Sequence, residues 1–149
     1  MAVKEAAAAR PSARERLLAA ADELFYNEGV HTVGIDRVIA AAGVAKASLY
    51  NTFGSKDELV RAYLQARYAS VTGTITRAVD RHGTPREQLL AVFDGQAELF
   101  ARPGYRGCAF ARASAESRPG DPADQAARAA AATLLDAALA RGTAARPSG

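Results

Sequence analysis

The sequence of 149 residues has little of several residue types, and each scarcity limits what the protein can be. Its single cysteine, Cys108, excludes an intrachain disulfide, as is usual in a reducing compartment. No apolar run approaches the length of a membrane span, and the N-terminus lacks the apolar core of a signal peptide. We therefore expect a cytoplasmic protein that does not associate with a membrane.

Large aromatic side chains are also scarce, because the sequence has no tryptophan and is only 7% aromatic. The hydrophobic fraction of 49% is supplied largely by alanine, which favours helix but buries little apolar area. A few large side chains must therefore anchor the packing.

The sequence shows no cluster of residues typical of a catalytic or metal-binding site. The two histidines, His31 and His82, are far apart and have no ligand cluster at metal spacing. No nucleophile–base pair, paired acidic site or phosphate-binding glycine loop is visible. The sequence predicts no metal, no cofactor and no catalytic residues, so we do not expect an enzyme.

An excess of positive charge is missing where nucleic-acid binding would need it. The formal charge of the whole sequence is +3, but residues 1–66 contain eight basic and eight acidic residues, which cancel. If this part binds nucleic acid, it does so through the local placement of charge and not through a bulk basic field.

What the sequence does contain is a series of helix signals. Ser12 with Glu15, Ser55 with Glu58, and Thr84 with Glu87 are capping boxes, and Pro85 suits a first helical position. With no alternating strand pattern, the chain is predicted to be all-α. The expected helices run from a cap at Ser12 to about Asn27, over 35–42 and 45–52, from the cap at Ser55 to about Arg81, and over 85–100, 108–116 and 122–141.

The helix at 85–100 is predicted to bury one apolar face, formed by Leu89, Leu90, Phe93, Ala97 and Phe100. Candidate residues for a ligand pocket in the helical body are Phe93, Phe100, Cys108 and Phe110. Cys108 is interpreted first as a small buried residue, with a reactive thiol as the alternative. Glu98 and Glu116 either line a pocket or, more simply, face solvent.

The stretch AAAGVAKASLYNTFGSKDEL, residues 40–59, places a helix of about two turns between Gly43 and Gly54. Two helices joined by a tight glycine turn, the second one short, are typical of a helix-turn-helix. The second helix of that motif enters a major groove about 12 Å wide, and the first helix braces it. Leu49 is expected to point into the core.

From Leu17 to Leu64 the sequence resembles the DNA-binding region of the tetracycline-repressor (TetR-like) family of bacterial regulators. The matching features are L-x-x-A-x-x-L-F ending at Gly29, then A-G-V-x-K, L-Y-x-x-F and S-K-x-x-L. The remaining residues match mainly in being helical, although RGCAF followed by Glu116 is similar to a sixth-helix pattern in one branch of the family.

The resemblance implies a set of DNA contacts at matching positions. Lys46, Tyr50 and Lys56 would contact phosphate, with a ring that only packs as the alternative for Tyr50. Ser48 and Asn51 would face base edges, and Asn can pair bidentately with adenine. Arg37, with Arg14 or Arg16, would contact flanking phosphates.

Some positions depart from the family pattern. Gly34 stands where the family usually has Ser or Thr, so a phosphate contact there would come from the backbone alone. Ala45 replaces a common Ser, and Ala47 replaces a common Gly.

The resemblance also implies a dimeric repressor that binds a palindromic operator in double-stranded DNA and is released by a small-molecule ligand. We expect a DNA-binding domain at 12–56, a ligand-binding and dimerisation domain at 57–141, and a disordered tail at 142–149. Leu134, Leu135 and Leu139 are candidates for a dimer contact, in a body that is short for the family. The alternative is a helical interaction protein that has lost DNA binding and acts by pairing with a full-length relative.

Overall fold

The computed structural model describes residues 10–129, 132 and 136. Its helices are α1 (Ala13–Glu28), α2 (Ile35–Ala42), α3 (Lys46–Phe53), α4 (Lys56–Val79), α5 (Pro85–Phe100) and α6 (Ala109–Glu116). Residues 122–129 are also helical, and the described part of the chain contains no strand, so the all-α prediction is confirmed. No helix among these residues is long and apolar enough to cross a bilayer.

Some expectations lie outside the described residues. They concern most of 130–141, with Leu134, Leu135 and Leu139, and the tail at 142–149.

The predicted caps set the helix starts. The Ser12 amide donates to Glu15 Oε2 at 2.7 Å, and the Ser12 hydroxyl accepts from the Glu15 amide at 3.2 Å. The pair Thr84 and Glu87 forms the same reciprocal box at the start of α5. At α4 only half of the predicted box is present, because the Ser55 hydroxyl accepts from the Glu58 amide while the Glu58 carboxylate pairs with Arg61.

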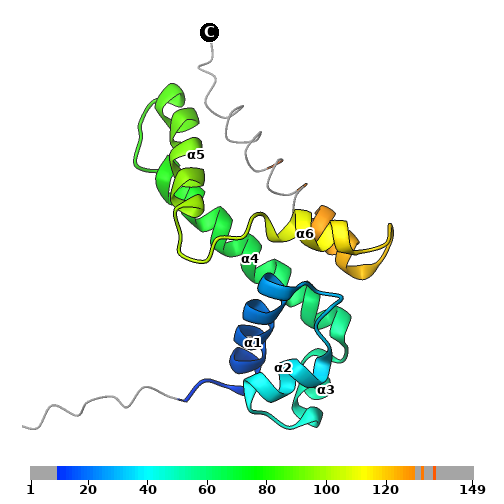
Figure 1. The fold of residues 1–149 in the computed structure, drawn as a ribbon. Coiled ribbons are helices and arrows are strands. Elements are labelled where there is room, and N and C mark those ends of the chain that lie inside the picture. Colours follow the sequence, from blue (N-terminus) through cyan, green and yellow to red (C-terminus); the bar gives the residue numbers. More distant parts are fainter. Residues whose placement is uncertain (1–9, 130–131, 133–135, 137–149) are drawn as a thin grey trace, which may run out of the picture.

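Helix α4 is the longest element and organises the fold (Figure 1). Its N-terminal half packs with α1 and α3, its C-terminal half lies beside α5, and α6 crosses near its middle. The larger core therefore joins both predicted domains, since Leu17 and Leu49 share one cluster with Phe110 and Ala127. The domain boundary near residue 57 stays a prediction, because the core does not break there.

The predicted buried face of α5 is wrong. Leu89, Leu90, Phe93 and Phe100 are exposed large apolar side chains, and Ala97 is exposed as well. Helix α5 instead turns Ala91, Gly95 and Leu99 inward. The cause is close helix approach: a β-carbon at Gly95 would lie 3.1 Å from Ile75 Cα, so only small residues fit there.

Candidate DNA-binding surface and effector groove

Helices α2 and α3 form the predicted helix-turn-helix. Gly43 ends α2 in the left-handed conformation, with φ 62° and ψ 41°, which suits a residue without a β-carbon. Leu49 of α3 is fully buried, and burying a leucine contributes roughly 1.5–3 kcal/mol to stability. The turn and this one inward side chain decide which face of α3 points to solvent.

Two arginines of α1 contact the helix-turn-helix. Arg16 Nη1 donates to the carbonyl of Gly43 at 3.1 Å, directly at the turn. The Arg14 guanidinium lies 5.6 Å from the centroid of the Phe53 ring at the end of α3. The turn before α3 and the last residue of α3 are thus both in contact with α1.

The outward face of α3 carries the side chains predicted to contact DNA. Tyr50 is 46% exposed, so part of its ring is open to solvent on this face, and its contact with phosphate stays a prediction. Asn51 is exposed and Ser48 is half-buried. None of the three is turned into the core, which leaves this face available to a groove of DNA.

Cations near α3 are present but paired with acids. Lys46 Nζ lies 3.1 Å from Asp36 Oδ1, and this hydrogen bond raises the pKa of Lys46. Arg37 donates to both carboxylate oxygens of Glu28, at 2.5 and 2.9 Å. These pairs are solvent-exposed, and exposed pairs are weak. A phosphate can therefore compete for either cation.

The other two predicted positions differ in setting. Lys56 is half-buried at the first turn of α4, and burial lowers its pKa. Gly34 has an extended backbone with φ −82°, and a β-carbon there would meet no atom within 4 Å. A glycine is thus not required by the backbone at position 34, and a larger residue would fit at the start of α2.

A groove of about 1220 Å³ runs along α4, with walls from α1, α5 and the loop that leads to α6. Phe100, Cys108 and Phe110 line it, as the sequence suggested, but Phe93 does not and is 62% exposed elsewhere on α5. Cys108 is exposed, so the interpretation as a buried residue was wrong.

One cation of the groove, Arg67, is already neutralised. Its Nε and Nη2 donate to the two carboxylate oxygens of Asp22, at 2.5 and 2.8 Å. Its guanidinium also lies 3.8 Å from the centroid of the Tyr26 ring. Arg67 therefore joins α4 to α1 across the groove wall.

The end of α1 is hydrogen-bonded to α6 and to the loop before it, and we call these contacts the α1–α6 junction. The Val30 amide donates to Glu116 Oε2 at 2.8 Å, and Arg112 donates to the Tyr26 carbonyl at 2.9 Å. The Tyr26 hydroxyl accepts from the Arg106 amide and donates to the Gly107 carbonyl. The junction connects a groove wall to the helix-turn-helix.

Sequence reasoning missed this junction, since its partners are about 80 residues apart. Glu116 does face solvent, as expected, but it also accepts the Val30 hydrogen bond. The one available signal was the sixth-helix pattern around RGCAF and Glu116.

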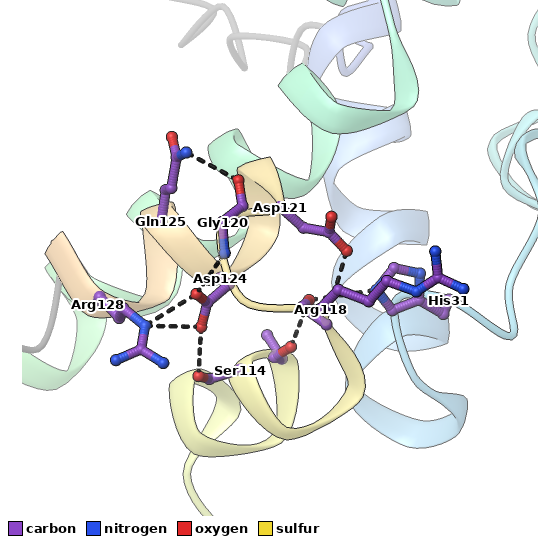
Figure 2. A network of polar contacts seen from close by, with 10 residues as sticks. His31, Ser114, Arg118, Gly120, Asp121, Asp124, Gln125 and Arg128 are labelled. Atoms are coloured by element: carbon purple, nitrogen blue, oxygen red, sulfur yellow. Dashed lines mark hydrogen bonds and ion pairs between the residues drawn. The ribbon is translucent and has the colours of Figure 1, made fainter.

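A second polar network holds α6 from its other side (Figure 2). The buried carboxylate of Asp124 accepts from the Ser114 hydroxyl at 2.7 Å, from Arg128 and from the Gly120 amide. These hydrogen bonds, led by that of Ser114, lower the pKa of Asp124 to about 2. Nearby, His31 contacts Ser117 at 3.2 Å, so the network borders the α1–α6 junction.

Comparison with known proteins decides the family. The sequence model described as "Bacterial regulatory proteins, tetR family" matches residues 17–63, which contain the whole helix-turn-helix. A TetR-family transcriptional regulator from Streptomyces coelicolor is 40% identical with a TM-score of 0.78, and the match covers 84% of this chain and 67% of that one. The chain belongs to the TetR family. The expected resemblance is confirmed.

Two TetR-family relatives with assigned roles regulate in opposite directions. The transcriptional activator FasR of Mycolicibacterium smegmatis is 35% identical over 99 residues, which are 65% of this chain and 45% of FasR. The transcriptional repressor NemR of Escherichia coli K12 is 30% identical over 105 residues, which are 69% of this chain and 53% of NemR. The chain thus matches these two relatives over about half of their length.

Proposed function

We propose that this TetR-family chain is a sequence-specific DNA-binding transcriptional regulator. The observation that carries the proposal is the exposed face of α3, held between Gly43 and Gly54 by the buried Leu49. An α-helix fits into a major groove, and the exposed residues of α3 include Lys46, Tyr50 and Asn51. Lys46, Tyr50 and Lys56 would contact phosphate, and Ser48 and Asn51 would contact base edges. Arg37 and the Gly34 amide would contact flanking phosphates.

The proposed target is a palindromic operator bound by a homodimer. Two recognition helices must lie about one DNA turn apart, roughly 34–36 Å, to enter successive major grooves. Selection of bound sequences from a random DNA pool tests both points, because it reports the half-sites and their spacing. A sequence with a single half-site, or a monomer by sedimentation at micromolar concentration, would contradict the dimer.

The proposed surface is tested by combining variants with a salt titration. Lys46→Ala with Tyr50→Ala should weaken operator binding strongly and flatten the dependence of log affinity on log salt by about 0.9 for each phosphate that the protein no longer neutralises. Arg86→Ala is the matched control, since Arg86 is exposed on α5 away from α3. Full retention of affinity in the double variant would reject this surface.

We further propose that the protein is a repressor that a small molecule releases. A ligand in the groove would contact α4 and the loop that leads to α6, and the α1–α6 junction would carry the change to the helix-turn-helix. Because fit depends on the distance between two recognition helices, a shift of a few ångströms is enough to lose it. A promoter–reporter assay with and without the gene decides the direction: higher expression without the gene supports repression.

One observation favours a second function. Lys46 and Arg37 are both paired with acids, and Gly34 offers no hydroxyl, as expected if DNA binding had been lost. The chain would then act by pairing with a full-length relative. Heterodimer formation, with no operator selected by the homodimer, would support this function over the first.

A further inference from the structure

Two arginines converge on one threonine hydroxyl near the C-terminal end of α4. Arg102 Nη2 donates to Thr74 Oγ1 at 2.6 Å, and Arg77 Nη2 donates to the same oxygen at 3.1 Å. Thr74 is 1% exposed, and its own hydroxyl hydrogen goes to the Ser70 carbonyl at 3.1 Å. The hydroxyl is therefore fully used, and it fixes two guanidinium groups side by side.

The positive charge at this point is only weakly balanced. Arg102 Nη2 and Arg77 Nη2 donate to the same oxygen, so the two guanidinium groups lie close together and their positive charges repel each other. Arg102 Nη2 lies 4.0 Å from Glu98 Oε1, at the outer limit of an ion pair. Arg67, by contrast, has both carboxylate oxygens of Asp22. An added anion is thus favoured at Arg102 and not at Arg67.

Arg102, but not Arg77, lines the groove. Ser70 lines it as well. Among the described residues, the Arg102 guanidinium donates two side-chain hydrogen bonds, to Thr74 and, at 3.5 Å, to the Ser70 hydroxyl, so further N–H donors of its five remain for a bidentate partner. The wall beside them is apolar. It consists of Val71, Ile75 and Val79 of α4 and Val92, Leu99 and Phe100 of α5.

We propose that the groove binds an amphipathic organic anion, with a carboxylate or phosphate head group on Arg102 and an apolar body along α4 and α5. The Ser70 hydroxyl donates to the head group, and Arg77 adds charge from the solvent side. This inference rests on the proposed function, because it names the class of ligand that the regulator senses.

The test is calorimetric titration of the full chain with octanoate, octyl phosphate and octanol at fixed ionic strength. Octanoate or octyl phosphate should bind at least about tenfold more tightly than octanol, as a charge-assisted hydrogen-bonded pair predicts. The stronger of the two anions identifies the head group. Equal affinity for octanoate, octyl phosphate and octanol, or no binding of any of them, would overturn the proposal.

Variants locate the head group. Arg102→Gln should remove the preference for the anion while octanol binding is unchanged, and Arg77→Gln, at an exposed residue, should weaken the anion by roughly threefold. Arg86→Gln is the control and should change neither. Anion binding that survives both Arg102→Gln and Arg77→Gln would reject the site.

Operator binding, measured on the same preparations, separates the two proposals. If the chain binds its operator but shows no preference for the anion, only the ligand inference fails. If the chain selects no operator but prefers the anion, the proposed function fails, while the inference about the class of ligand still holds.

Discussion

The carboxylate of Glu116 in α6 occupies the space in which a side chain at Gly29 would have to lie. A β-carbon at Gly29 would be 2.6 Å from Glu116 Oε2, and the backbone there has a φ of +104°. The same carboxylate accepts the hydrogen bond of the next amide, that of Val30, at 2.8 Å. The end of α1 is thus shaped to receive α6, which makes the α1–α6 junction a specific contact.

Gly29→Ala should destabilise the protein by about 1–3 kcal/mol, because alanine is strained at this φ and because the Glu116 carboxylate has to move. The measurement is urea denaturation followed by circular dichroism. Gly34→Ala is the matched control, since its φ is −82° and its β-carbon would meet no atom within 4 Å. Similar stability of the two variants would contradict a built contact between α1 and α6.

Tyr26→Phe should loosen the loop before α6 without disturbing the helix-turn-helix. The variant leaves the Arg106 amide and the Gly107 carbonyl without their partner, at a cost of about 1–3 kcal/mol if they stay buried. Hydrogen exchange should rise at residues 105–108 and stay constant in α2 and α3. Tyr68→Phe is the control, because the Tyr68 hydroxyl makes no hydrogen bond among the described residues. Uniform exchange across both regions would argue against the junction.

Asp36→Asn should strengthen DNA binding. Asp36 holds Lys46 at 3.1 Å in an exposed pair, so its removal frees the cation for phosphate and takes a negative charge from the surface. We expect affinity to rise roughly two- to fivefold, because exposed pairs are weak. Fluorescence anisotropy with labelled duplex DNA measures it, and Asp94→Asn on the exposed side of α5 is the control. Unchanged or weaker binding by the variant would contradict a phosphate contact by Lys46.

Asp124 should make the stability of the body depend on pH in a defined window. Its pKa in the folded protein is lowered to about 2 from an ordinary value of 3.8, first by the Ser114 hydrogen bond and then by Arg128. The folded state therefore favours the ionised form, and this contribution is complete above pH 3.8 and is lost as the pH falls towards 2.

The measurement is denaturation of the parent and of Asp124→Asn from neutral pH to pH 2. The parent should be more stable at neutral pH, and the difference should shrink below pH 4, while Asp94→Asn should show no such trend. A difference that stays constant through this window would contradict the role given to the carboxylate.

The helix starts and ends were predictable because their causes are local. The capping residues Ser12 and Thr84 lie three residues from their partners, and Gly43 ends α2 by its own backbone conformation. The helix-turn-helix followed from the same local signals, and so did the inward position of Leu49. These interactions form within one or two turns of chain, so the sequence carries them completely.

The apolar periodicity of α5 gave a wrong prediction of the face that packs against α4. On α5 the large side chains predicted an inward face, but the structure buries Ala91, Gly95 and Leu99 against α4. At Gly95 the Ile75 backbone approaches so closely that size, and not hydrophobicity, decides which residues face inward.

By itself the sequence determined the all-α class, the helix ends and the short recognition helix between two glycines. Only the tertiary structure decided that Glu116 meets Gly29, that Asp22 neutralises Arg67, and that Arg77 and Arg102 share Thr74. The physical reason is that each of these contacts depends on how closely whole helices approach and at what angle. That geometry results from the packing of all their side chains together and is not encoded in any short stretch of residues.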